Sequence, residues 1–178
     1  SEGFTVSLSN AIGATISDDT GVGTIKDDGT GNSASGGSGS GTDNDTPTLS
    51  VSSPTVTEGG WAEFTVSLSN ASTQAVSFTP SLSDITALLG TDTAASGSLE
   101  VSTDGGSHWS TVSGAVTIAA GETSLKLRIA TTDDAISESS ETFRLSTGAV
   151  TGSVTNGSGA SGTATITDND IAPTLSVN

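Results

Sequence analysis

The sequence has 178 residues, enough for one domain of ordinary size, and its 20 acidic residues against four basic ones give a formal net charge of −16. The absence of cysteine excludes a disulfide scaffold and a thiolate zinc site. So acidic a chain repels phosphate backbones, and no apolar run approaches the roughly 20 residues that a membrane helix needs, so we expect neither nucleic-acid binding nor membrane insertion. These properties favour a secreted β-protein whose partner is a cation.

The first 28 residues contain two short segments in which apolar and polar residues alternate, and they end in the acidic pair Asp27-Asp28. Alternation with a period of two indicates β-strands. Both segments have counterparts near the end of the chain: residues 2–6 match residues 141–145, and residues 23–28 match residues 162–168. We therefore predict that residues 1–28 are the last two strands of a preceding repeat, without the rest of that repeat.

A stretch of very simple composition follows. Residues 29–42 consist of Gly, Ser and Thr with one Asn and one Ala. Such a stretch behaves as a flexible coil with an end-to-end distance of about 20 Å. We assign residues 29–45 as a Gly/Ser-rich linker.

One segment of the chain occurs twice. Residues 43–51, Asp-Asn-Asp-Thr-Pro-Thr-Leu-Ser-Val, return as residues 168–177 with Ile-Ala in place of Thr46. A repeat of this kind indicates a tandem array of similar units. We expect residues 46–170 to be one complete domain and residues 171–178 to begin the next, so that neighbouring repeats of the same chain are its partners.

The complete unit is dense in period-two alternation. The clearest segments are residues 61–68 and 124–130, and shorter ones contain the pairs Val76/Phe78, Leu99/Val101, Val116/Ile118 and Phe143/Leu145. Turn residues separate them at intervals of about 8–20 residues, which favours an all-β sandwich over alternating strands and helices. Residues 83–89 could hold one helical turn. We expect Lys126, Arg128 and Arg144 to form one small basic cluster on an outer sheet face.

The carboxylates of this unit concentrate at the ends of predicted strands, for example in Thr57-Glu58-Gly59 and Thr132-Asp133-Asp134. Like charges this close destabilise a fold unless something neutralises them. Six to eight oxygen ligands are what Ca²⁺ requires, so these residues could bind calcium. The alternative is that they are solvated turn residues, because Asp and Asn favour turns in any case.

Four motifs of this unit, taken together, resemble those of a Calx-β domain. They are Val56-x-Glu58-Gly59-Gly60, Phe64-Thr65-Val66-Ser67-Leu68-Ser69, Asp133-Asp134-x-x-x-Glu138-x-x-Glu141-x-Phe143 and Gly162-Thr163-Ala164-x-Ile166-x-Asp168-Asn169-Asp170. Residues 99–109 and 116–123 are also similar to the Ca²⁺-dependent extender repeats of giant RTX (Lap-type) bacterial adhesins. The resemblance covers residues 46–170 almost end to end. It implies an Ig-like Greek-key β-sandwich of about seven strands, with calcium at one end near the junction with its neighbour.

The resemblance also implies a set of calcium ligands. Carried over position by position, they fall on Glu58, Asp92, Asp134, Glu138, Glu141, Asp168 and Asp170, with Asp133 as a further candidate. The sequence departs from the family pattern at Thr93, where Tyr is usual. It departs again at Asn169, which stands between two aspartates where a third acidic residue is usual.

Catalytic residues are not indicated. His108 is the only histidine, it precedes Trp109 in a predicted turn, and the sequence contains no G-x-S-x-G nucleophile motif. We therefore expect that the protein is not an enzyme. Trp61 and Trp109 could offer a platform to a sugar, but packing at strand edges explains them more simply.

The resemblance implies a mechanical function. We expect an extender module of a bacterial surface adhesin, monomeric and rigidified by Ca²⁺, which projects a distal binding region for cell adhesion and biofilm formation. The expected location is extracellular, at the bacterial surface after type I secretion. The alternatives are a carbohydrate- or protein-binding β-sandwich module of a secreted protein and an accessory β-domain of a secreted hydrolase.

Overall fold

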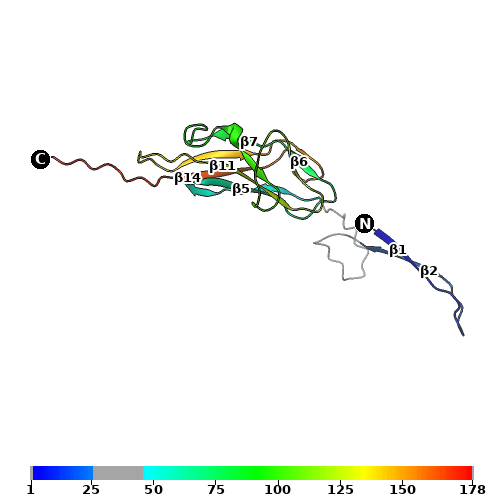
Figure 1. Ribbon diagram of the computed structural model, residues 1–178. Coiled ribbons are helices and arrows are strands. Elements are labelled where there is room, and N and C mark those ends of the chain that lie inside the picture. Colours follow the sequence, from blue (N-terminus) through cyan, green and yellow to red (C-terminus); the bar gives the residue numbers. More distant parts are fainter. Residues whose placement is uncertain (1, 26–45, 178) are drawn as a thin grey trace. The chain divides into compact units, whose positions relative to one another are not determined.

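The structure is a computed structural model, and it describes residues 2–25 and 46–177 (Figure 1). It divides into two compact units, residues 1–45 and residues 46–178. The predicted linker, residues 29–45, lies outside the described residues. None of the helices in the described part is both long enough and apolar enough to cross a membrane.

The first unit is a two-stranded antiparallel ribbon made of β1 (Glu2–Ser7) and β2 (Thr20–Ile25). Phe4 lies opposite Gly23, and its counterpart Phe143 lies opposite Ala164. Phe4 is 51% exposed, whereas Phe143 is fully buried. Residues 2–25 thus form a strand pair whose phenylalanine is exposed, and the assignment of residues 1–28 to a preceding repeat stays a prediction.

The second unit contains twelve strands in the described residues. Their bounds are β3 (Leu49–Val51), β4 (Thr55–Thr57), β5 (Trp61–Leu68), β6 (Val76–Phe78), β7 (Ser81–Asp84), β8 (Glu100–Ser102), β9 (Ser110–Thr111), β10 (Val116–Ile118), β11 (Ser124–Ala130), β12 (Glu141–Ser146), β13 (Val150–Thr151) and β14 (Ser161–Thr167). The one helix described is a single 3₁₀ turn, η1 (Ser96–Ser98). Residues 83–89 hold no helical turn, so that prediction is wrong: β7 occupies the first two positions and bends follow.

The strands form three sheets. A five-stranded sheet has the order β3-β5-β11-β8-β9, a four-stranded sheet has the order β4-β14-β12-β7, and a three-stranded sheet has the order β10-β6-β13. All pairs are antiparallel except β4 with β14. The prediction of an all-β sandwich is confirmed.

The strands are more numerous than the seven expected because prolines divide some of them. Pro54 separates β3, in the five-stranded sheet, from β4, in the four-stranded sheet. Pro80 separates β6 from β7, which again belong to different sheets. Proline has no backbone N–H to donate to a sheet, so the hydrogen-bond ladder is interrupted at each proline. In both places the chain then continues in the four-stranded sheet.

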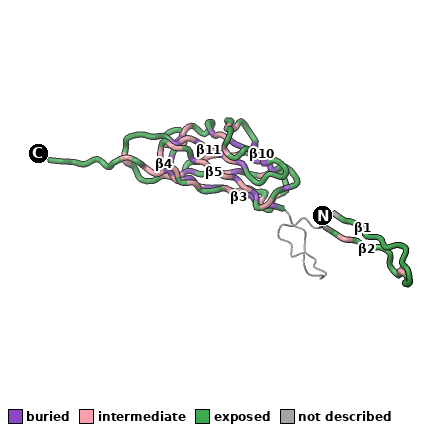
Figure 2. Tube along the Cα trace, turned by 60° about the horizontal axis from the view of Figure 1, so that its bottom comes forward, coloured by how far each residue is buried: buried purple, intermediate pink, exposed green. Residues whose placement is uncertain are grey.

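The core lies where the predicted alternation placed it. Along β5 every second residue is buried, beginning with Ala62, and β11, β12 and β14 alternate in the same way. Figure 2 shows buried residues along the strands of this unit, with its loops mostly exposed. The rings of Phe64 on β5 and Phe143 on β12 meet edge to face, with centroids 5.9 Å apart and planes at 74°. Both rings are fully buried, so this contact joins the five-stranded sheet to the four-stranded one.

The basic residues do not form one cluster. Lys126 and Arg128 lie on β11 in the five-stranded sheet, whereas Arg144 lies on β12 in the four-stranded sheet, so the predicted single cluster is wrong. Period-two alternation indicates which side chains point outward, but the sheet to which a strand belongs depends on pairing that the sequence does not show.

We predict that deleting residues 1–42 leaves the stability of the second unit unchanged. A two-stranded ribbon adds little stability by itself, and residues 46–178 form a compact unit of their own. The midpoint of thermal unfolding, followed by circular dichroism, should shift by no more than about 2 °C. A loss of about 5 °C or more would show that the ribbon is an integral part of the sandwich.

Candidate metal centre

Carboxylates from four segments of the chain converge at one end of the sandwich. The segments are the turn between β4 and β5, the loop after β7, the loop between β11 and β12 together with the first residue of β12, and the residues that follow β14. Backbone hydrogen bonds fasten these four segments to one another in two pairs. Glu58 donates its N–H to Thr167 O (3.1 Å), and Thr132 donates its N–H to Asp92 O (2.9 Å).

Gly59 lets two of these loops approach closely. Its φ is +75°, in the left-handed region that favours glycine, and a Cβ at this position would lie 2.9 Å from the Cβ of Asp133. A side chain at residue 59 would therefore push the loop between β11 and β12 away from Glu58. The Glu-Gly-Gly sequence of this turn thus has a direct role in positioning the acidic residues.

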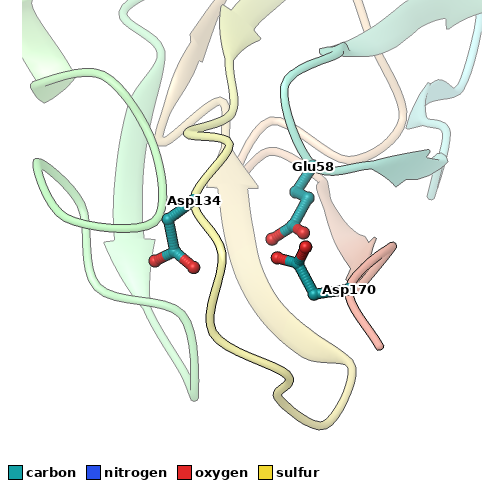
Figure 3. Close-up of side chains that lie close together, drawn as sticks. All are labelled: Glu58, Asp134 and Asp170. Atoms are coloured by element: carbon teal, nitrogen blue, oxygen red, sulfur yellow. The ribbon is translucent and has the colours of Figure 1, made fainter. Parts of the chain in front are cut away.

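The first carboxylate cluster contains Glu58, Asp134 and Asp170 (Figure 3). One carboxylate oxygen from each residue lies within 4.8 Å of those of the other two. Figure 3 shows the side chains of Glu58 and Asp170 pointing toward one another, with the side chain of Asp134 beside them on another loop. Three segments that are far apart in the sequence thus supply one group of oxygens.

The second cluster contains Asp92, Glu138 and Glu141, whose oxygens also lie within 4.8 Å of one another. One pocket is lined by members of both clusters, namely Glu58 and Asp134 of the first and all three residues of the second. The two clusters therefore form one acidic centre. Thr91, Thr132 and Ser139 also line it but were not predicted, and their position next to predicted carboxylates in the sequence is the only signal that could have indicated them.

Backbone N–H groups orient two of the carboxylates. Leu88 N–H donates to Asp92 Oδ2 (2.6 Å), and Ile136 N–H donates to Asp134 Oδ1 (2.7 Å). Each of these bonds occupies one oxygen of its carboxylate. These bonds fix the direction of both side chains at the pocket.

Asp168 is in the same region, but its oxygens are used within the protein. Asp168 Oδ1 accepts from Asp170 N–H (2.9 Å), and Asp168 Oδ2 accepts from Glu138 N–H (2.9 Å) and Ser137 Oγ (3.3 Å). The backbone N–H groups of Asp170 and Glu138, helped by Ser137 and Glu58, outweigh desolvation and lower the pKa of Asp168. Asp168 thus holds the segment after β14 against the loop before β12, and it lies outside both clusters.

Asp133 also lies outside both clusters. Its Oδ1 accepts from Asn169 Nδ2 (3.2 Å), so it positions the segment after β14 through that amide. The structure therefore brings together six of the eight predicted ligand residues, and places Asp133 and Asp168 where they support the other six.

The site fits a hard cation. Asp170 Oδ2 is buried and, alone among the buried side-chain oxygen and nitrogen atoms of the described residues, has no hydrogen-bond partner. A buried carboxylate oxygen without a partner is costly, and a cation is the partner that its charge calls for. The oxygen donors are carboxylates near the ends of strands, with the hydroxyl groups of Thr91, Thr132 and Ser139 beside them. Oxygen ligands of this kind suit Ca²⁺.

Two of the clustered carboxylates, Glu58 and Glu141, have raised pKa values. The N–H of Asn169 donates to Glu58 Oε1 (3.2 Å) and by itself lowers the pKa of Glu58. Desolvation and the charges of Asp168, Asp170 and Asp134 together exceed that effect and raise the pKa. In the second cluster, burial raises the pKa of Glu141, with further contributions from a hydrogen bond to Asp92 and the charges of Asp92 and Glu138.

Comparison with known proteins agrees with this arrangement in part. Residues 97–170 match the family model of the Calx-beta domain. The sandwich is Calx-β-like. The matched region contains four of the six clustered carboxylates, and Glu58 and Asp92 precede it.

Solved structures with similar backbones include two Calx domains and a cohesin. The apo-form Calx CBD1 domain has 17% sequence identity and a TM-score of 0.46, covering 69% of this chain and 99% of that one. The calcium binding domain CBD12 of CALX1.1 has 18% identity and a TM-score of 0.47, covering 68% and 44%. A type I cohesin in complex with dockerin from Clostridium thermocellum has 10% identity and a TM-score of 0.39, covering 68% and 94%. No curated protein matches the sequence.

We predict that the metal-free protein becomes less stable as the pH rises above 4.5, the ordinary pKa of a glutamate. Glu58 and Glu141 have pKa values raised above their ordinary 4.5, so they bind protons more tightly when folded. Their contribution to stability is complete below pH 4.5 and is lost as the pH rises through the raised values. Asp168 acts in the opposite sense, and its contribution is lost only as the pH falls below 3.8 toward its lowered pKa.

The measurement is a series of thermal melts in chelator at pH values from about 3 to 7. Glu58→Gln and Glu141→Gln should each flatten the decline above pH 5, whereas Glu122→Gln, an exposed residue outside the site, should not. A wild-type melting temperature that rises steadily from pH 5 to pH 7 would contradict the prediction.

Proposed function

We propose that this chain is part of a tandem array of calcium-binding Calx-β-like modules, which act as an extender in a bacterial surface adhesin. The observation that carries the proposal is the place of the acidic centre. Six carboxylates from four segments meet at the end of the sandwich where β14 leads into a second copy of the module's own first residues.

Calcium is the cation that we propose for this centre. When bound, it supplies the positive charge that the two clusters lack. Glu58, Asp134 and Asp170 hold it in the first cluster, and Asp92, Glu138 and Glu141 hold it in the second, while Asp133 and Asp168 support the ligand loops. Because Asp170 lies three residues before Pro173, the ligands include the segment that leaves the module.

The proposed role is mechanical and not catalytic. The loops at this end repel one another as long as their carboxylates are ionised and unliganded, so the exit from the module is not held in one direction. With the carboxylates neutralised, the exit is fixed to three other loops of the same module. An array of such modules is stiff in calcium and flexible without it, which suits a spacer at the cell surface after secretion.

The alternative of a sugar-binding module finds less support. Its aromatic platform would be Trp61 and Trp109, but the guanidinium of Arg128 lies over both rings, 4.0 and 4.1 Å from their centroids. Arg128 Nε also donates to Glu100 Oε2 (2.7 Å). Both rings thus pack against a residue of their own sheet, as expected for a structural contact.

We predict that calcium raises the melting temperature and that the increase depends on both clusters. Binding to the folded state alone contributes about 2.7 kcal/mol at a hundredfold excess over Kd. Glu58→Gln should remove the increase that comes from the first cluster, and Glu141→Gln the increase from the second. Each change keeps the shape of the side chain and removes its charge.

The measurement is thermal unfolding with chelator or with millimolar calcium, together with isothermal titration calorimetry of each variant. Glu122→Gln is the matched control, because Glu122 is exposed and lies in neither cluster. Identical melts of the wild type in chelator and in calcium would exclude a calcium site of stabilising affinity.

We further predict that calcium lengthens a tandem of two modules. The tandem consists of residues 46–170, then Ile171-Ala172, then residues 47–170, which keeps the native junction. It should show a larger maximum dimension in small-angle scattering when calcium is added. A control tandem joined through residues 29–45 should not respond, because its composition predicts a flexible coil in either condition. Equal responses of the two tandems would contradict the extender role and favour a binding module.

A further inference from the structure

Thr131 is a buried polar residue close to the acidic centre. It directly follows Ala130, the last residue of β11, and it is 6% exposed. It belongs to neither carboxylate cluster and does not line the pocket. A buried hydroxyl is unfavourable unless it is hydrogen-bonded, so valine, which has the same shape, would suit this position better if the hydroxyl had no role.

The hydroxyl of Thr131 contacts the turn that carries Glu58. Thr131 Oγ1 donates to Gly60 O (3.0 Å) and lies 3.5 Å from Thr57 O. These carbonyls belong to the last and first residues of the turn 57–60, which Gly60 N–H closes by donating to Thr57 O (3.1 Å). Glu58 stands between them, at the second position of the turn. One hydroxyl on a different loop therefore reaches both ends of this turn.

Neither carbonyl needs this hydroxyl in order to be satisfied. Gly60 O also accepts the backbone N–H of Thr131 (2.8 Å), and Thr57 O accepts the N–H of Gly60. The turn would thus keep its backbone hydrogen bonds if the hydroxyl were absent. What the hydroxyl adds is a fixed distance between the two ends of the turn and the start of the loop between β11 and β12.

Thr131 is also linked to the loop that carries part of the second cluster. It pairs with Thr93 in an isolated antiparallel bridge, and Thr93 is 1% exposed. Thr93 directly follows Asp92, and three residues after Thr131 its own loop reaches Asp134. Thr131 thus stands where the segments that carry Glu58, Asp92 and Asp134 meet.

The turn needs an anchor because of the charges around it. The first cluster, Glu58, Asp134 and Asp170, has carboxylate oxygens within 4.8 Å of one another. Like charges this close push the turn away from the other two segments as long as no cation lies between them. Thr131 is on the same loop as Asp134, so its hydroxyl directly opposes the separation of Glu58 from Asp134.

We propose that Thr131 is a positioning residue of the first cluster: its hydroxyl fixes the turn 57–60 relative to the loop between β11 and β12, so that Glu58 and Asp134 are presented to one cation. This inference rests on the calcium site proposed above, and it adds a residue that supplies no ligand atom to that site. Removal of a group that orients metal ligands commonly lowers metal affinity about 10–100-fold.

Thr131→Val tests the proposal, because valine keeps the shape of the side chain and removes only the hydroxyl. The variant should weaken calcium binding at the first cluster about tenfold in isothermal titration calorimetry. Thr131→Ser, which restores the hydroxyl, should recover most of the affinity. If Thr131→Val does not fold by circular dichroism, Thr131→Ala takes its place.

Thr147→Val is the matched control. Thr147 is fully buried, and its Oγ1 is likewise hydrogen-bonded to backbone carbonyls, those of Gly148 (3.1 Å) and Ala160 (3.3 Å). It lies between β12 and β13 and does not line the pocket. Its hydroxyl also accepts the N–H of Ala160, so this variant should lose more thermal stability than Thr131→Val but no calcium affinity.

A double-mutant cycle identifies the cluster on which Thr131 acts. In the Glu141→Gln background, which lacks a carboxylate of the second cluster, Thr131→Val should still cost about tenfold in affinity. In the Glu58→Gln background the first cluster is disabled, and Thr131→Val should leave the remaining affinity unchanged. An equal loss in both backgrounds would mean that the substitution loosens the whole end of the sandwich, and it would overturn the proposal.

A measurement without metal separates this inference from the calcium proposal. In chelator, Thr131→Val should accelerate hydrogen exchange of the Gly59 and Gly60 amides about tenfold by NMR, whereas Thr147→Val should not. If the wild type binds no calcium, the calcium proposal fails, and this exchange decides whether Thr131 holds the turn. Unchanged exchange in Thr131→Val, or unchanged affinity where the wild type does bind calcium, would contradict the role of Thr131.

Discussion

The repulsion among carboxylates at one end of the sandwich is the constraint on which the rest of this structure depends. A two-sheet core can tolerate one acidic loop in water, but here four segments bring their carboxylates to one pocket. Desolvation and the neighbouring charges together raise the pKa values of Glu58 and Glu141. The fold has to hold these segments together against that repulsion. It does so with backbone hydrogen bonds and with the close packing that Gly59 permits.

The same constraint explains why similar residues have different roles. Asp168 accepts three hydrogen bonds from its surroundings and so acts as an anionic support for the chain after β14. Asp170, two residues later, has a buried oxygen with no donor. One aspartate is satisfied by the protein and the other is not, and this difference distinguishes a structural carboxylate from one available to a cation.

The segment that leaves the module and the strand that begins it have the same sequence. The exit segment follows directly from Asp168 and Asp170, while its sequence repeats the entrance strand β3. Residues that match β3 therefore leave the module at its charged end. In the array that we propose, these residues begin the next sandwich.

The sequence by itself determined the sandwich, its core and the region of the acidic centre. Alternation identified Phe64 and Phe143 as inward-facing because a strand places every second side chain on the same face. Only the tertiary structure decided which carboxylates meet. Asp133 and Asp134 are adjacent, yet one binds Asn169 and the other joins Glu58 and Asp170, because the direction of each side chain depends on the backbone of the loop and on which loops pack beside it. In the same way, alternation could not assign Arg144 to a different sheet from Lys126, since strand pairing is set by contacts between distant segments.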